Sequence, residues 1–333
     1  MKAKISIMAG FLVGAVLLYF AFRNIDFRNL LGIYSKVRAV YILPFIVTTL
    51  LELLCRAARW RLLLNPSSPV RLRDSFKLQA AGLALNNLLP LRLGELARAT
   101  FGAGLFSIPL LTVLATILVE RALDVLVLFA LFAGAARFGG LTGGFLNYDS
   151  LMLTMFAGVA AAIAALIFSD ELISHHWFAG FFARFPRLRL LFERVAMGVK
   201  GFHSFKSGFL IFLYAVGQWV LDAVNYYWIG LAFGLGGVLN IYKCMALVFT
   251  GAVAASVPGM PGYFGNFEFT LTKVLVSWGV PSDIGFAFAS YCHVLNYLLL
   301  TLLGLVFVYQ MGHSVGKVWR EFSSGGAREP REN

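Results

Sequence analysis

The sequence predicts an all-α polytopic membrane protein with about six transmembrane helices and two re-entrant helical hairpins in an inverted repeat. Hydrophobic residues make up 59% of the 333 residues, charged residues only 13%, and the mean hydropathy is +0.79. A soluble domain does not need so apolar a chain, whereas a bundle of membrane-spanning helices does. Two apolar stretches are also broken by proline and glycine at matching places in the two halves, a pattern typical of transporters.

The expected spans are apolar stretches long enough to cross the roughly 30 Å hydrocarbon core, which needs about 20 helical residues. The first follows Lys2 and Lys4 and lacks a small-residue cleavage site, so we expect a retained span rather than a cleaved signal peptide. The expected bounds of the spans are 5–22, 39–55, 109–133, 150–168, 208–233 and 284–311.

The first broken stretch, 86–98, contains two amides, a proline, a glycine, two arginines and a carboxylate. The apolar run before it, 76–89, is too short to cross the membrane. Pro90 removes a backbone donor and Gly94 loosens the helix. Freed backbone groups are tolerated at membrane depth only where protein or a wet cavity satisfies them, so we expect a re-entrant hairpin at 75–106 that lines a cavity.

The second broken stretch follows the apolar run 241–257 and again leads to a carboxylate, Glu268. We expect a second re-entrant hairpin at 240–280, because two broken segments at corresponding places are the best sequence indication of a transporter's binding site. The residues that break it are Pro258, Gly259, Pro261, Gly262 and Gly265.

The distribution of lysine and arginine predicts the orientation. A first basic cluster, which includes Arg56, Arg59 and Arg61, is expected in a cytoplasmic loop. The segment 184–206 and the tail from Lys317 are basic as well, which places both termini in the cytoplasm and the protein in the inner membrane. The segments 134–149 and 234–240 are not basic and are expected outside. The segment 23–38 is basic and disagrees with this orientation.

This topology divides the chain into two half-repeats of three spans and one hairpin each, with the first hairpin entering from the cytoplasm and the second from outside. The expected halves are 1–140 and 141–315. Between them, the loop 170–206 is expected to lie along the membrane surface as an amphipathic helix. The basic tail 316–333 has the composition of a disordered segment.

Ionisable residues within a span are candidate functional residues, because each costs about 2.5–3.5 kcal/mol to insert unless it finds a partner or water. Glu120, Arg121 and Asp124 stand in the middle of the third span. Two interpretations are open: a structural ion pair within the helix, or an arginine that reaches Glu95 or a lipid phosphate.

The fifth and last spans also carry polar residues. Gln218, Asp222 and Asn225 have helical spacing and form one stripe, which either lines a pathway or joins helices by hydrogen bonds. His293 and Asn296 lie in the last span. A lone histidine within the membrane is more often structural, although it is able to titrate near neutral pH.

Arg92 and Arg98 are the leading candidates for contact with a phosphate, together with the amides Asn86 and Asn87. The guanidinium fork matches phosphate geometry and stays charged when partly desolvated. The alternative is that these arginines only neutralise Glu95. Three roles are open for the carboxylate of the second hairpin: compensating an arginine, taking up a proton, or capping the helix that follows.

Composition and motifs argue against several other classes of protein. The formal charge of +12 could indicate nucleic acid, but the basic residues flank spans, so anionic lipid headgroups are the expected partner. Cys55, Cys244 and Cys292 lack metal or redox spacing. We find no phosphate-binding glycine loop, metal cluster or nucleophile elbow, so no cofactor and no metal are expected.

Three motifs stand in order along the chain: Asn87-x-x-Pro90-x-Arg92-x-Gly94-Glu95-x-x-Arg98, Glu120-Arg121-x-x-Asp124, and Pro258-Gly259-x-Pro261-Gly262-x-x-Gly265-x-x-Glu268. In this order and spacing, over most of the chain, they resemble the lysylphosphatidylglycerol synthase transmembrane-region family. That family includes the flippase domains of the synthases, hopanoid-biosynthesis-associated membrane proteins and membrane domains attached to archaeal glycosyltransferases. The resemblance implies lipid translocation between leaflets, with roles at the matching positions Arg92, Glu95, Arg98, Glu120, Arg121, Asp124 and Glu268.

The chain departs from the family pattern in two ways. The soluble aminoacyl-transferase domain of the synthases is absent, so lysyl transfer is not expected. His293 stands where the last span of the family often has an arginine, which changes the charge balance of that position.

The leading hypothesis is therefore a flippase or scramblase for an anionic phospholipid or polyprenyl-phosphate-linked lipid. Nothing in the sequence binds ATP, so transport is expected to be downhill or ion-coupled. The first rival is a membrane-embedded transferase with Glu95 or Glu268 as general base. The second is a scaffold for a lipid-modifying enzyme, and the sequence also leaves a homodimer open.

Overall fold

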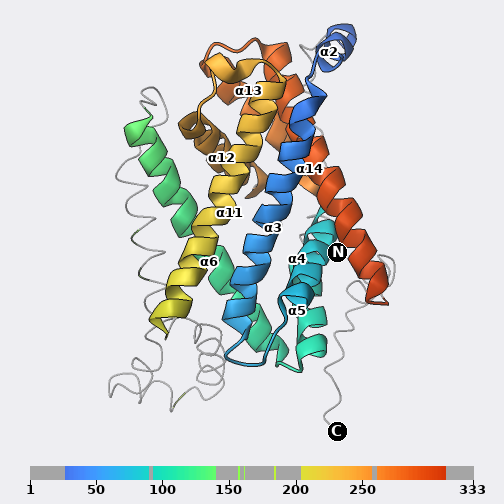
Figure 1. Ribbon diagram of the computed structural model, residues 1–333, viewed down its shortest axis with the longest axis vertical. Coiled ribbons are helices and arrows are strands. Elements are labelled where there is room, and N and C mark those ends of the chain that lie inside the picture. The colour runs from blue at the N-terminus through green and yellow to red at the C-terminus, as the bar shows by residue number, and fades with distance from the viewer. Residues whose placement is uncertain are drawn as a thin grey trace.

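The computed structural model describes residues 27–89, 93–139, 204–256 and 261–312, together with the isolated residues 157, 161 and 184. The predicted span 5–22 and the tail 316–333 lie outside these residues. So do almost all of the predicted span 150–168 and almost all of the predicted surface helix 170–206. All regular structure in the described part is helical (Figure 1). Its elements are α2 (Phe27–Tyr34), η1 (Ala39–Tyr41), α3 (Ile42–Leu64), α4 (Leu72–Leu88), α5 (Leu93–Phe106), α6 (Leu110–Phe138), α11 (Phe205–Ala232), η4 (Leu235–Gly237), α12 (Ile241–Ser256), η5 (Pro261–Tyr263), α13 (Asn266–Ser277) and α14 (Ser282–Gln310).

The described helices include three that are long and apolar enough to cross a membrane: Ala39–Leu64, Phe205–Ala232 and Ser282–Gln310. They correspond to three of the predicted spans. α6 has 29 residues, but its central charged residues exclude it from this apolar set. Large apolar side chains point away from the bundle, among them Leu43, 69% exposed, and Leu302, 63% exposed. Such outward apolar surface suits contact with lipid chains.

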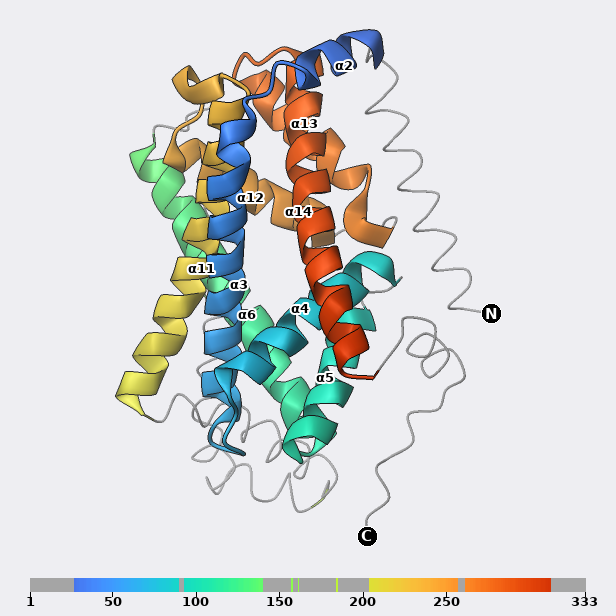
Figure 2. The same ribbon diagram turned by 45° about the vertical axis from the view of Figure 1, so that its right-hand side comes forward.

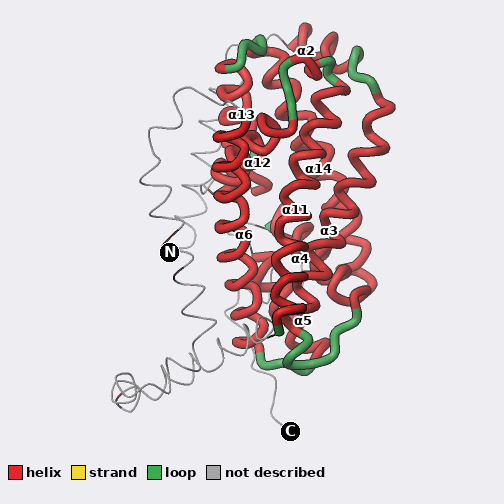
Figure 3. The backbone as a smooth tube through the Cα atoms, turned by 60° about the vertical axis from the view of Figure 1, so that its left-hand side comes forward, coloured by secondary structure: helices red, strands yellow, loops and turns green. Residues whose placement is uncertain are grey.

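The long helices run side by side, and the loops between them gather at the two ends of the molecule (Figure 3). α3 packs along α11, and α14 packs against both α4 and α13. α4 and α5 form an antiparallel pair that starts and finishes at the lower end in Figure 2, whereas α12 and α13 form a pair that starts and finishes at the upper end. The inner end of the first pair meets the second, because α4 contacts η5.

Glycine allows the closest approaches between these helices. A Cβ atom on Gly94 of α5 would overlap the carbonyl oxygen of Gly82 and lie 2.5 Å from the backbone nitrogen of Asn86 on α4. A Cβ on Gly304 of α14 would overlap the carbonyl oxygen of Ala80. Small residues at such contacts let helix backbones pack directly on one another.

The prediction that the second span ends at residue 55 is wrong, because α3 continues to Leu64. Arg56, Arg59 and Arg61 therefore lie on a helix rather than in a cytoplasmic loop. The helix continues because its basic residues find partners: Arg56 pairs with Glu52 one turn earlier, and Arg59 is fully buried against carboxylates of α6. The predicted hairpin ranges 75–106 and 240–280 correspond in sequence to α4–α5 and to α12–α13.

Candidate functional site

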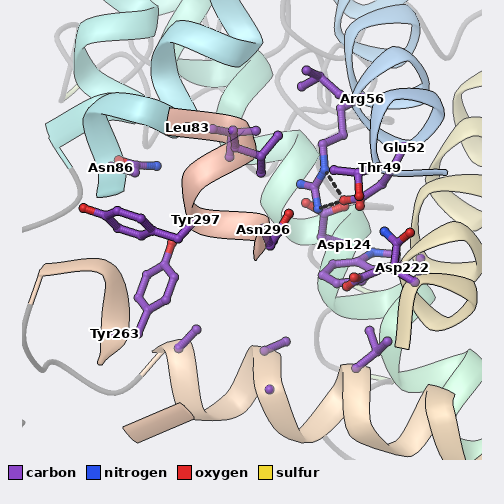
Figure 4. A pocket seen from close by; sticks show the side chains of 18 of the residues that line it. Thr49, Glu52, Arg56, Leu83, Asn86, Asp124, Asp222, Tyr263, Asn296 and Tyr297 are labelled. Atoms are coloured by element: carbon purple, nitrogen blue, oxygen red, sulfur yellow. Dashed lines mark hydrogen bonds and ion pairs between the residues drawn. The ribbon is translucent and has the colours of Figure 1, made fainter. Parts of the chain in front are cut away.

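The described helices enclose a cavity of about 370 Å³, within the range of about 300–1,000 Å³ that small-molecule sites usually have. Side chains from α3, α4, α5, α6, α11, α12 and α14 line it, and Figure 4 shows the polar ones converging from several helices. The predicted site residues among the lining are Asn86, Asn87, Glu95, Arg98, Arg121, Asp124, Asp222, His293 and Asn296.

The other predicted positions are of two kinds. Arg92 lies outside the described residues, as do the hairpin breaks Pro90, Pro258 and Gly259. Glu120 and Glu268 do not line the cavity, but each binds a residue that does. They therefore lie one contact behind the wall.

Arg98 is held tightly. Its Nη2 donates to Oε2 of the buried Glu120 at 2.6 Å, and its guanidinium lies 4.5 Å from the centroid of the Trp60 ring. Trp60 is held in turn by a 3.0 Å hydrogen bond to Thr116. Only 4% of Arg98 is exposed, so most of this guanidinium serves the packing of α5 against α3 and α6.

Arg59 completes this charged cluster from α3. Its Nη1 donates to Asp124 Oδ1 at 2.6 Å, and its Nη2 lies 3.6 Å from Glu120. Two amides add hydrogen bonds: Gln218 donates to Asp124 at 2.7 Å and Gln79 to Glu120 at 3.2 Å. We call Arg59, Glu95, Arg98, Glu120, Arg121 and Asp124 the charge network.

Arg59 was not predicted as a site residue, because the sequence analysis placed it in a loop. The signal that was available is the spacing Glu52, Arg56, Arg59 in a stretch that stays apolar to Leu64. Residues three and four apart share a helix face. Charges repeated at that spacing within an apolar helix indicate partners inside the bundle.

Arg121 is the most accessible of the three arginines in the charge network. It lies 3.1 Å from Asp124 and 3.7 Å from Glu95, and 39% of its side chain is exposed. Glu95 is also partly exposed, at 32%. Both interpretations of this region thus have structural support: Arg121 makes an ion pair within α6, and it also reaches Glu95 on α5 while facing the cavity.

A second charged group lies on the wall formed by α3 and α11. Arg56 donates to Glu52 at 2.9 Å through Nε and lies 5.6 Å from the centroid of the Trp219 ring. Asp222 lies near this pair on the same side of the cavity (Figure 4). Glu52 and Arg56 are lining residues that the sequence analysis did not select as site residues.

Polar contacts between helices hold the rest of the lining. The polar stripe on α11 joins helices and also faces the cavity: Asn225 accepts a hydrogen bond from Thr48 of α3, and Asp222 and Asn225 line the cavity. Asn87 donates to Thr301 of α14 at 2.9 Å. These bonds tie α4 to α14 and α3 to α11 around the cavity.

The second half contributes a buried pair. His293 Nδ1 lies 2.6 Å from Glu268 Oε1, and Glu268 Oε2 accepts from the backbone N–H of Gly265 at 2.7 Å. Glu268 thus caps the start of α13, one of the three roles considered for it. Gly262 and Gly265 have φ angles of +72° and +93°, a backbone conformation that favours glycine, and Pro261 begins η5. The chain turns here before α13.

The described residues contain no group of three or more histidines, cysteines or carboxylates able to hold a metal ion. Cys55, Cys244 and Cys292 all have free thiols. The polar groups that line the cavity are therefore arginines, carboxylates, amides, hydroxyls, one thiol and one imidazole.

These features define a class: a multi-pass helical membrane protein with a charged cavity inside its bundle. The family model for the "Lysylphosphatidylglycerol synthase TM region" matches residues 7–304, and the chain belongs to this family. It is also similar to a UPF0104 membrane protein of Methanothermobacter thermautotrophicus, with 24% identity over 303 residues that cover 81% of this chain and 85% of that protein. No solved structure matches.

Proposed function

We propose that this protein moves an anionic lipid between membrane leaflets, as a flippase or scramblase. The observation that carries the proposal is the cavity itself: a space of about 370 Å³ inside an apolar bundle, lined by apolar side chains together with charged ones, with partly exposed Arg121 in its wall. Charged groups are costly within a membrane and are kept where they serve a pathway or a ligand. A lipid headgroup is a ligand that such a bundle meets from the bilayer.

The proposal also assigns a role to the two helix pairs. We infer that α4–α5 and α12–α13 are re-entrant hairpins that enter the membrane from opposite sides, as their directions in Figure 2 and the contact of α4 with η5 suggest. In that arrangement each pair closes the cavity toward one face of the membrane. Small movements of one pair against the other would open the headgroup site to each leaflet in turn.

Within the cavity, we propose that the lipid phosphate binds Arg121. A guanidinium with two loose ion pairs, at 3.1 and 3.7 Å, still has donors to offer. Arg92, from the segment between α4 and α5, is the proposed second phosphate contact. Arg98 has the supporting role of holding Glu120, because its guanidinium is buried between Glu120 and the Trp60 ring.

Reconstitution in liposomes tests this function. Purified protein in vesicles with a trace of fluorescent phosphatidylglycerol should equilibrate the label between leaflets, and no new covalent lipid should form. Arg121→Gln should slow this exchange about tenfold or more, since a hydrogen bond to a charged group contributes about 1.5–3 kcal/mol. Arg121→Lys should fall between the two, because lysine keeps the charge and loses the fork.

The matched control is Arg73→Gln, which removes an exposed arginine of α4 outside the cavity lining. It should leave the exchange rate unchanged. A wild-type protein that exchanges no lipid would contradict the proposal, and a covalently modified lipid in the same vesicles would favour the transferase. Mass spectrometry of lipid that copurifies with the protein would then identify the natural substrate.

A further inference from the structure

The buried pair His293–Glu268 has both carboxylate oxygens occupied but only one ring nitrogen. Both oxygens of Glu268 are engaged, one by Nδ1 of the imidazole at 2.6 Å and the other by the Gly265 N–H at 2.7 Å. The carboxylate therefore cannot turn toward the cavity without losing two hydrogen bonds. It fixes the imidazole and keeps Nδ1 occupied.

The other ring nitrogen of His293, Nε2, is not engaged by Glu268. His293 lines the cavity and is only 6% exposed, and its Nε2 has no hydrogen-bond partner within the described part of the chain. Phe264 and Phe267 hold the ring, with centroids 4.4 and 4.7 Å from that of the imidazole. A buried polar atom without a partner is costly, so an oriented Nε2 beside a cavity indicates a ligand or a proton.

Few charges compete for this imidazole. Glu268 is the charged group that the described residues place within 4.0 Å of it. The titratable or charged side chains that line the cavity together with His293 are Glu52, Arg56, Glu95, Arg98, Arg121, Asp124, Asp222, Tyr226, Tyr263, Cys292 and Tyr297. The elements packed around α14 also carry, among others, Tyr34 on α2, Lys77 on α4, Cys244 on α12 and Lys273 on α13. Lys77 and Lys273 are engaged with phenylalanine rings, and the phenols and thiols are ordinarily neutral at pH 7.

Resting on the proposed function, we propose that His293 is a further phosphate-binding residue in the cavity, in addition to the arginines proposed above, and that a proton on its imidazole switches this contact on. With Nδ1–H donated to Glu268, neutral His293 presents a bare Nε2 that cannot donate to phosphate. Protonation places one N–H and one positive charge there. The proton comes from the solvent: an O–H bond of a hydronium ion breaks and the Nε2–H bond forms.

Linkage fixes the direction of the effect. Because the protonated form binds phosphate better, affinity for an anionic lipid is expected to rise as the pH falls from alkaline to acidic. By reciprocity, lipid binding must draw a proton onto the protein, and the two effects share one factor. The paired arginines of the charge network stay charged throughout this range. Such a contact would make lipid transport sensitive to the proton concentration on the side to which the cavity is open.

The test measures binding of fluorescent phosphatidylglycerol to the full-length protein in detergent micelles, between pH 5.5 and 8.5. Phosphatidylglycerol is chosen because its phosphodiester keeps one negative charge across this range. Wild-type affinity should be about tenfold higher at the acidic end, the size expected of a hydrogen bond to a charged group. His293→Gln should bind weakly at every pH, and His293→Arg, with a permanent cation, should bind tightly at every pH.

Two controls keep the assignment specific. The other four of the five histidines remain in both variants, so a pH dependence that survives in His293→Gln overturns the proposal. Asp222→Asn removes another carboxylate of the cavity lining and should keep the wild-type pH dependence. If it abolishes that dependence, Asp222 is the proton site and the proposal is wrong.

A measurement on the wild type alone covers the case in which a variant does not fold. Adding phosphatidylglycerol micelles to weakly buffered protein near pH 7 should raise the pH, by up to about one proton taken up per lipid bound. No uptake overturns the proposal. Displacement of the lipid by inorganic phosphate at millimolar concentration would assign the site to free phosphate and overturn its lipid part.

The two levels of proposal fail differently. Lipid exchange that depends on Arg121 but binding that is independent of pH would leave the transport function standing and remove the role of His293. Absence of both binding and exchange would remove both. Arg121→Gln should lower affinity equally at pH 5.5 and 8.5, which separates a permanent cation from a switched one.

Discussion

The two sides of the cavity wall accommodate buried charged groups in opposite ways. On the side of α3, α5 and α6, six charged side chains neutralise one another, and the fully buried Arg59 lies between two carboxylates. On the side of α13 and α14, one carboxylate holds one imidazole among aromatic rings. The first arrangement has permanent charges that neutralise one another, whereas in the second, according to our proposal, a proton on the imidazole supplies the charge. Comparing them shows which buried charges shape the bundle and which are available to a ligand.

The largest expected effect comes from breaking the charge network at Arg59. Arg59→Met would leave Asp124 and Glu120 buried with one cation fewer. Removing one partner of a buried ion pair typically costs about 3–5 kcal/mol, so the thermal midpoint in detergent should fall strongly. Arg61→Met is the control, because Arg61 binds a backbone oxygen in a part-buried setting near the end of α3. Equal midpoints for the two variants would show that the network does not stabilise the fold.

Arg92 tests whether the permanently charged side also binds lipid. Arg92→Ala should reduce headgroup binding roughly tenfold or more, from the loss of a contact of about 1.5–3 kcal/mol, and Arg92→Lys should recover part of the transport rate. Liposome exchange and the midpoint of unfolding are measured together.

A double variant separates the two roles considered for Arg92. If Arg92→Ala combined with Glu95→Gln restores both stability and transport, Arg92 is only a counter-ion for Glu95. If stability returns while transport stays low, Arg92 contacts the phosphate.

The smallest effect is expected at the junction between the two sides. Thr301→Val removes the partner of Asn87 Nδ2, which should lower the free energy of unfolding by about 1 kcal/mol. The thermal midpoint should shift slightly, and the pH dependence of lipid binding should be unchanged, since this bond involves neither an arginine nor the imidazole. A change in that pH dependence would show that the junction couples the two sides.

Several features of the fold were predictable from local properties of the chain. Hydropathy placed α6, α11 and α14 within a few residues of their bounds, and proline and glycine indicated where α4–α5 and α12–α13 are interrupted. The bounds of α3 were not predictable in this way. Counted by the positive-inside rule, its arginines indicate a cytoplasmic loop. The carboxylates that permit the burial of Arg59 come from another helix, and Asp124 is 65 residues away from Arg59 in the sequence.

The sequence by itself determined the class of protein, the family motifs and most of the charged residues that line the cavity, because hydrophobic length and the cost of buried charge act wherever a residue stands. Tertiary structure alone decided the partners. Arg98 binds Glu120 rather than Glu95, Arg59 joins the network, and Glu268 holds His293. The physical reason is that an ion pair between helices depends on which faces pack together, and spacing along one helix does not contain that information.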